Sequence, residues 1–115
     1  MKRTHLRFGK GFHVALRNAR AQAATMTLVA GDSEGAPDNY HRGTDQWLFV
    51  VSGKGSARIN GKRYPLRPGS LILIERGDKH EIDAAAGSSL KTINLYVPPA
   101  YTPAGNELQP AKPSS

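Results

Sequence analysis

Short alternating or apolar runs, separated every few residues by glycine, proline, asparagine or aspartate, limit most strongly how this chain can fold. The clearest case is a hairpin: residues 57–59 and 63–66 alternate on either side of Asn60-Gly61, which supplies the two positive-φ positions of a type I′ turn. The best helix candidate, 14–24, places charged and amide side chains among alanines and lacks an apolar stripe. The pattern therefore predicts an all-β fold.

Seven short strands are expected, at 25–30, 47–51, 57–59, 63–66, 70–74, 80–82 and 90–97. Strands of this length with turns between them indicate a β-sandwich or a small barrel. The runs 47–51 and 70–74 are apolar on both faces, so we expect both faces to be buried, by closure of the barrel or by a dimer. The run 90–97 instead separates an apolar face (Ile93, Leu95, Val97) from a face with Thr92, Asn94 and Tyr96.

Length and composition exclude several classes of protein. At 115 residues the chain is expected to form one domain. It has no cysteine, which excludes disulfides, thiolate catalysis and cysteine-based zinc sites and fits a cytoplasmic protein. Its apolar runs are too short to span a membrane, and no signal-peptide core follows the basic N-terminus.

The net charge of +7 is concentrated early, because six lysines and arginines precede the first acid, Asp32. Such a segment can attract nucleic acid or anionic ligands. No helix-turn-helix, zinc finger or RNA-binding aromatic motif accompanies it, so we expect a solvated basic surface and no nucleic-acid partner. We divide the chain into a basic N-terminal segment (1–22), a barrel (23–101) and a flexible proline-rich tail (102–115).

Two of the four histidines stand where chemistry is expected. His41 and His80 each follow a turn at the start of a predicted core strand, whereas His5 and His13 lie in the basic segment without a nearby acid. Two histidines and a carboxylate on one face can hold a first-row metal with open positions. A barrel suits such a site, because inward side chains from neighbouring strands converge in a protected pocket.

The arrangement around these histidines resembles that of small single-domain cupins. The first cupin motif is matched by Gly35, His41 and Gly53, with Gly43 at the second histidine position and Gln46 at the glutamate position. The second motif is matched by Gly69 and His80, with Glu75-Arg76-Gly77 in place of Pro-x-Gly and Ala84 in place of the asparagine. The resemblance covers roughly residues 23–101.

The resemblance implies a small antiparallel β-barrel, or double-stranded jelly roll, that forms a homodimer by exchange or pairing of N-terminal strands. It also implies one divalent transition metal (Fe, Mn, Ni or Zn) on His41 and His80, with Gln46 or Asp45 as third ligand. Asp45 would reach inward only if residues 44–45 are loop, because neighbours in a strand face opposite ways. Arg58, Asn94 and Tyr96 are the implied substrate contacts.

With Gly43 and Gln46 in place of the second histidine and the glutamate, two functions remain open. The first is a metal-dependent enzyme acting on a small polar or anionic molecule, with dioxygenase, isomerase or decarboxylase chemistry, among which the fold does not choose. The second is a non-catalytic module that binds a small ligand through a degenerate metal site. Trp47 and Phe49 share the face opposite Gln46, where core or dimer packing is expected.

Overall fold

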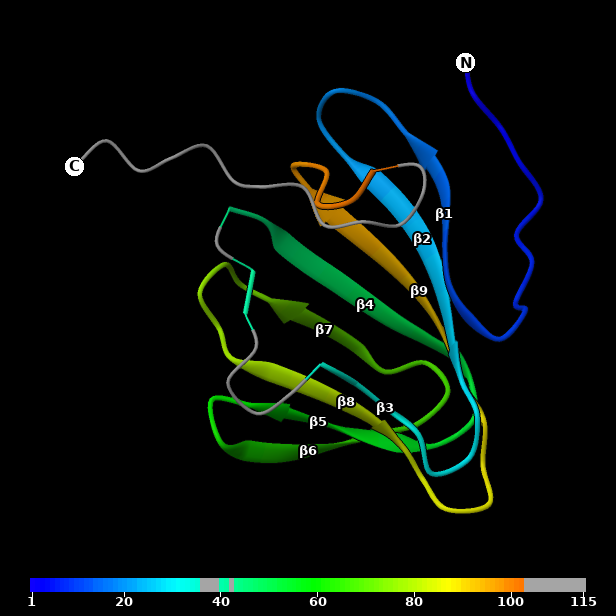
Figure 1. The fold of residues 1–115 in the computed structure, drawn as a ribbon, viewed down its shortest axis with the longest axis vertical. Helices are drawn as coiled ribbons and strands as arrows, with labels where there is room; N and C mark the ends of the chain where they lie inside the picture. The colour runs from blue at the N-terminus through cyan, green and yellow to red at the C-terminus, as the bar shows by residue number, and fades with distance from the viewer. Residues whose placement is uncertain (36–39, 42, 103–115) are drawn as a thin grey trace.

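A computed structural model of the protein describes residues 1–35, 40–41 and 43–102. This part of the chain is all-β (Figure 1) and contains no helix that is long and apolar enough to cross a membrane. Its strands are β1 (Gly11–Arg17), β2 (Gln22–Leu28), β3 (Ser33–Gly35), β4 (Asp45–Ser52), β5 (Gly55–Ile59), β6 (Lys62–Leu66), β7 (Leu71–Ile74), β8 (His80–Ala84) and β9 (Leu90–Val97).

The strands form two antiparallel sheets that pack against each other as a jelly roll, the predicted fold. One sheet has the order β1-β2-β9-β4-β7 and the other the order β3-β8-β5-β6. In Figure 1 the five-stranded sheet lies above and the four-stranded sheet below. Between them lies the hydrophobic core, made of Met26, Leu28, Leu48, Val50, Ala57, Leu66, Ile74, Ile82, Ala84 and Leu90.

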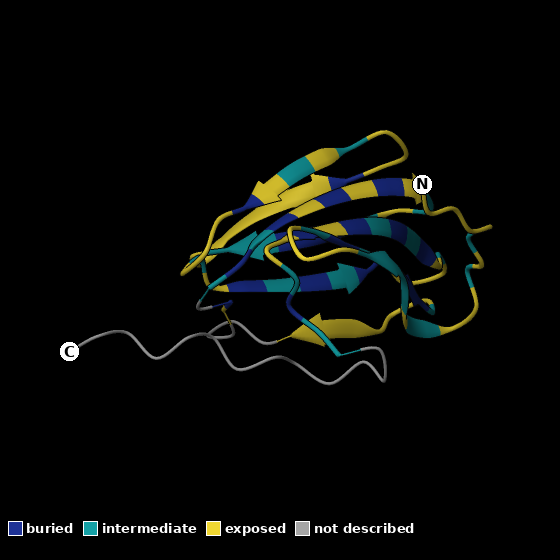
Figure 2. Cartoon of the chain, turned by 90° about the horizontal axis from the view of Figure 1, so that it is seen from above, coloured by how far each residue is buried: buried dark blue, intermediate teal, exposed yellow. Residues whose placement is uncertain are grey.

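Strand alternation decides which residues of the five-stranded sheet enter the core. On β4, Gln46, Leu48 and Val50 are buried, while Trp47 and Phe49 are 41% and 40% exposed. Alternating bands of buried and exposed residues are visible along the strands in Figure 2. The expectation that residues 47–51 and 70–74 are buried on both faces is therefore wrong for the single chain, because nothing among the described residues covers the outer face of β4 and β7 there.

The central hairpin has the predicted geometry. Asn60 and Gly61 have φ angles of 49° and 84°, and β5 pairs with β6 in register around them. The last strand is also found where expected, at β9. Two strands were not expected: β3 lies in a stretch of turn-forming residues, and β1 lies within the basic segment 1–22.

The five-stranded sheet thus begins at Gly11, before the barrel boundary that the sequence indicated at residue 23. β1 pairs along β2, and its Phe12 ring packs on Tyr96 and Tyr101, with ring centroids 6.2 Å and 4.6 Å apart. Basic and polar residues alternate with the inward side chains of β1, so the sequence pattern did not identify this segment as a strand. Residues 103–115 of the predicted tail lie outside the described residues.

Two glycines near the start of β5 allow strands to approach closely. A Cβ on Gly55 would lie 2.1 Å from the backbone oxygen of Asp83. At Gly53, which has φ of +87°, a Cβ would lie 1.7 Å from the backbone oxygen of Ser89. Since the opposing atoms belong to the backbone, a side chain at either position would force strands apart.

We predict that Gly55→Ala lowers the free energy of unfolding by about 1–3 kcal/mol or more, because the added methyl group overlaps the Asp83 carbonyl. The measurement is urea denaturation followed by Trp47 fluorescence. Gly9→Ala is the control, because its Cβ would find only His13 Nε2, at an ordinary 3.7 Å. Equal stability of the two variants would show that β5 and β8 are not held this closely.

Candidate functional site

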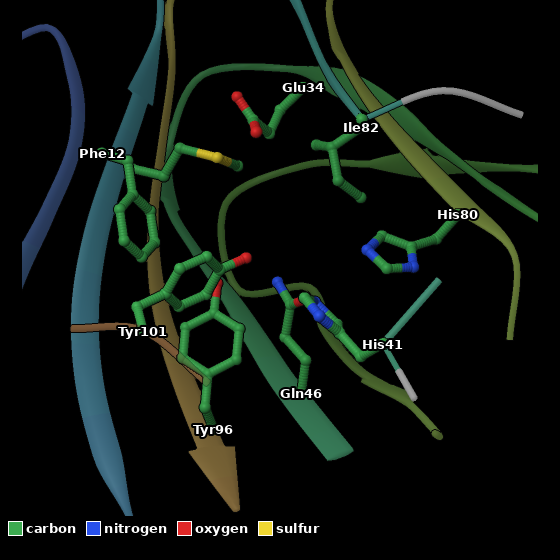
Figure 3. Close-up of a pocket in the computed structure, with 10 residues that line it drawn as sticks. Phe12, Glu34, His41, Gln46, His80, Ile82, Tyr96 and Tyr101 are labelled. Carbon is green, nitrogen blue, oxygen red and sulfur yellow. The ribbon is translucent and has the colours of Figure 1, made fainter. Parts of the chain in front are cut away.

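The predicted histidines meet in the space between the two sheets. His41 precedes β4, His80 is the first residue of β8, and both are buried together with Gln46 on β4. The two imidazole rings have centroids 4.9 Å apart. In Figure 3 the side chains of His41, Gln46 and His80 point toward one another beside Tyr96. The structure therefore brings together residues separated by up to 39 positions in the sequence, from His41 to His80.

A chain of buried hydrogen bonds runs behind His41 into the five-stranded sheet. His41 Nε2 lies 2.9 Å from Gln46 Oε1, and Gln46 Nε2 donates to Asn94 Oδ1 at 2.9 Å. Asn94 Nδ2 donates to Thr92 Oγ1 at 3.0 Å, and that hydroxyl donates to the backbone oxygen of Met26 at 3.2 Å. Four side chains from three segments thus act as one polar network.

The last acceptor fixes the direction of every bond in this network. A backbone carbonyl can only accept, so the Thr92 hydroxyl uses its proton on Met26 and accepts from the Asn94 amide. Because Asn94 donates through its nitrogen, its Oδ1 accepts from the Gln46 nitrogen. The Gln46 oxygen then faces His41 and accepts from it. His41 therefore carries its proton on Nε2, and that nitrogen points into the network.

His80 has the opposite ring orientation. Its Nδ1 donates to the backbone oxygen of Asp78 at 3.1 Å, which leaves Nε2 as the nitrogen that carries a lone pair. Burial lowers the pKa of His80 below its ordinary value of 6.5, and the nearby His41 lowers it further, while the bond to Asp78 opposes the shift. His80 is therefore a neutral hydrogen-bond acceptor near pH 7.

A tight turn over residues 75–78 holds both histidines in place. The backbone N–H of Gly77 donates to the backbone oxygen of His41 at 2.8 Å, and Asp78 accepts from the His80 ring. Asp45 accepts from the backbone N–H of Arg76 at 2.9 Å and forms an ion pair with its guanidinium at 3.3 Å. The hydrogen bonds and charge of Arg76 keep the pKa of Asp45 below its usual value.

Asp45 thus lies on the outside of the turn, away from the histidines. It belongs to β4, where alternation sends its side chain opposite to Gln46, and Arg76 holds it there. In the structure Asp45 therefore does not lie beside His41 and His80, where a third ligand was expected. It instead ties β4 to the turn that orients them.

The histidines border a cavity of about 120 Å³, roughly the volume of four water molecules at ~30 Å³ each. Its lining residues come from both sheets and from the chain after β9: Phe12, Met26, Glu34, Gly35, His41, Gln46, His80, Ile82, Tyr96 and Tyr101. Among the implied substrate contacts, Tyr96 lines the cavity. Asn94 lies behind Gln46, fully buried. Arg58 is not a lining residue, because its neighbour Ala57 occupies the core face of β5.

Three lining residues were not predicted from the sequence: Phe12, Glu34 and Tyr101. Phe12 lies on the unexpected strand β1 and Glu34 on the unexpected strand β3. Tyr101 is fixed by Gln22, whose Oε1 accepts from the backbone N–H groups of Ala100 and Tyr101 at 3.1 Å and 3.0 Å and whose Nε2 donates to Tyr101 O at 2.7 Å. Such contacts across 79 positions leave no local pattern.

The donor set does not fit the divalent metal that the resemblance implies. The part of the chain that the structure describes holds no group of three or more His, Asp or Glu side chains placed to bind a metal ion. His41 Nε2 and Gln46 Oε1 bond to each other, and Asp45 is paired with Arg76. Protein hydrogen bonds occupy His41 Nε2 and His80 Nδ1, and no third His, Asp or Glu among the described residues joins these two rings, where a transition-metal site commonly takes three protein ligands.

Comparison with known proteins identifies the family. The cupin domain model matches residues 24–96, so the chain belongs to the cupin family. An oxalate-binding protein from Thermotoga maritima is 25% identical over 83 residues, which cover 72% of this chain and 67% of that protein.

Solved structures show the same fold. A protein from Bacillus halodurans has a TM-score of 0.76 at 20% identity, covering 86% of this chain and 76% of its own. A cupin protein from Bacteroides fragilis has a TM-score of 0.69 at 23% identity, covering 95% and 96%. The family and the fold are those that the motifs around His41 and His80 indicated.

We predict that Gln46→Glu creates a metal site that the natural chain does not have. The introduced carboxylate would join His41 and His80 as two histidines and one carboxylate, and its negative charge would attract a divalent cation that the neutral Gln46 amide does not. Elemental mass spectrometry of tag-free protein exposed to iron, manganese, nickel and zinc is the measurement.

The natural chain should hold well below one metal per chain, and Gln46→Glu should hold more. Adding His41→Ala and His80→Ala to Gln46→Glu should remove the gain. Near-stoichiometric metal in the natural protein that is lost in His41→Ala/His80→Ala would contradict the assignment of hydrogen bonds given above.

Proposed function

We propose that this cupin binds a small molecule in the cavity between its two sheets, through protein hydrogen bonds and without a metal ion. One observation carries this proposal. The polar network behind His41 is satisfied within the protein, while His80, at the cavity wall, bonds to Asp78 through Nδ1 and keeps the Nε2 lone pair on the other side of its ring. A buried polar network with one vacant position beside a cavity is typical of a ligand site.

Binding is favoured over turnover by the same residues. Metal-dependent chemistry of the kind that the resemblance suggested is disfavoured, because the donor set around His41 does not fit a metal ion. The curated relative from Thermotoga maritima is named for binding a small molecule, which supports a binding role for this chain as well. The cavity limits the ligand to a few non-hydrogen atoms.

Ligand binding should raise the melting temperature of the natural protein in a screen of small molecules, because a ligand that binds only the folded state stabilises it. His80→Ala removes the vacant acceptor and should weaken the best ligand about three- to tenfold by calorimetry. His13→Ala is the matched control, because His13 is an exposed histidine on β1 outside the cavity. Equal affinity in the natural protein and in His80→Ala would contradict the proposed site.

The outer face of the five-stranded sheet is apolar and exposed in the single chain. Seven exposed apolar side chains lie there on three neighbouring strands: Trp47, Phe49 and Val51 on β4, Leu71 and Leu73 on β7, Leu95 and Val97 on β9. They are contiguous, since Trp47 is opposite Leu73 on one side and Leu95 on the other. We infer that a second copy of the chain covers this apolar face and forms a homodimer.

The area of this apolar face supports a second copy of the chain as the partner. With the seven side chains each about two-fifths exposed or more, the apolar face measures on the order of 500–600 Å², the upper end for a monomer. With its rim it approaches the ~800 Å² per partner of a stable interface, and a flat sheet face can pair with itself around a two-fold axis. The N-terminal segment lies over β2, where Thr25 and Thr27 donate to Arg7 O and Phe8 O.

The dimer expected through N-terminal strands is a different arrangement, and in the structure β1 pairs with β2 of the same chain. Trp47→Glu should convert a dimer into a monomer, measured by size-exclusion chromatography with light scattering. Tyr64→Glu is the matched control, because Tyr64 is 42% exposed on the other sheet. A monomeric natural protein, or a dimer that survives Trp47→Glu, would show that another partner or no partner covers this face.

A further inference from the structure

The described lining residues of the cavity carry acceptors and a negative charge, and none of them is cationic. None of its ten described lining residues is lysine or arginine, although the chain has 16 of them. The one acidic lining residue is Glu34, an exposed residue of β3. Figure 3 shows its carboxylate directed toward the cavity, on the side opposite Gln46. An anionic ligand would meet this carboxylate without a compensating positive charge.

The hydrogen-bond directions give the cavity the same polarity. His41 donates a hydrogen bond from Nε2 to Gln46, and His80 donates one from Nδ1 to the backbone oxygen of Asp78. A neutral His80 therefore offers the cavity a lone pair on Nε2, which accepts from an N–H or O–H group and repels a carboxylate oxygen. The Gln46 amide uses one of its two N–H groups on Asn94, so at most one N–H remains there as a donor.

Aromatic rings close the remaining side. The Tyr96 and Tyr101 rings meet edge to face with centroids 5.0 Å apart, and Phe12 packs on Tyr101 at 4.6 Å. Figure 3 shows these three rings together on the side of the cavity away from His80. Glu34 and His80 thus favour the same kind of ligand from two directions.

We propose that the cavity selects small N–H or O–H donors without negative charge, ammonium compounds above all, and rejects carboxylates such as oxalate. This inference rests on the proposed function and adds the ligand class to it. The donor group would bind His80 Nε2, and a positive charge would lie beside Glu34. The chain's net charge of +7 does not reverse this preference, because charges farther away than about 8–10 Å are screened in physiological salt.

Four probes of similar size test the ligand class: ethanolamine, ethylene glycol, glycolate and oxalate. Calorimetry and melting temperature should rank ethanolamine first and ethylene glycol second, with no binding of the two anions. Glu34→Gln should weaken ethanolamine about two- to fivefold and leave ethylene glycol unchanged, the range for a partly exposed ion pair. Glu81→Gln is the matched control, because Glu81 lies on the adjacent strand β8 outside the cavity.

Nitrogen NMR of the imidazole rings reports the site directly. Without ligand, His41 should be protonated on Nε2 and His80 on Nδ1, and ethanolamine should shift the His80 Nε2 resonance. Oxalate or glycolate binding that shifts the same resonance would overturn the ligand class and leave the proposed function standing. If no probe shifts either ring, and no small molecule in the wider screen does, the proposed function fails as well.

Discussion

The carbonyl oxygen of Met26 determines the chemistry of the site at a distance. It accepts from Thr92, and from there the donor direction is fixed through Asn94 and Gln46 to the His41 ring. Each of these polar groups is buried, so leaving one unpaired would cost on the order of 1–3 kcal/mol. The network is therefore rigid in geometry and in proton position. Because of this network, the Nε2 nitrogen of His41 donates a hydrogen bond to Gln46 and is not available to bind a metal ion.

The polar network also explains why the five-stranded sheet has an unusual distribution of side chains. On β9, Thr92, Asn94 and Tyr96 point inward, and this leaves Leu95 and Val97 on the solvent side. The same parity on β4 directs Gln46 inward and Trp47 outward. On β4 the inward face also carries Leu48 and Val50 of the core, so that strand is apolar on both faces. On β9 the inward polar side chains leave the apolar Leu95 and Val97 on the outer face.

The parts of the fold that depend on local pattern could be predicted from the sequence. Asn60-Gly61 identifies its hairpin because few dipeptides adopt positive φ twice, and the convergence of His41 and His80 follows from the cupin spacing. β1 and β3 were not predicted. β1 is an edge strand in a basic segment and β3 has three residues, and neither shows a repeating hydrophobic pattern. The outer face of β4 was misjudged for a different reason: an apolar side chain is compatible with a core and with an interface, and sequence alone does not separate the two.

Asp45 shows why a residue type next to a motif is weak evidence for its role. It is adjacent to Gln46, and the carboxylate would complete a metal site if it turned inward. Strand alternation turns it outward, and Arg76 then holds it by an ion pair and a backbone hydrogen bond. The turn so anchored binds the backbone of His41 through Gly77 and accepts from the His80 ring through Asp78. In this cupin the carboxylate of Asp45 therefore positions the histidines from outside the cavity, and His80 faces the cavity as a neutral acceptor.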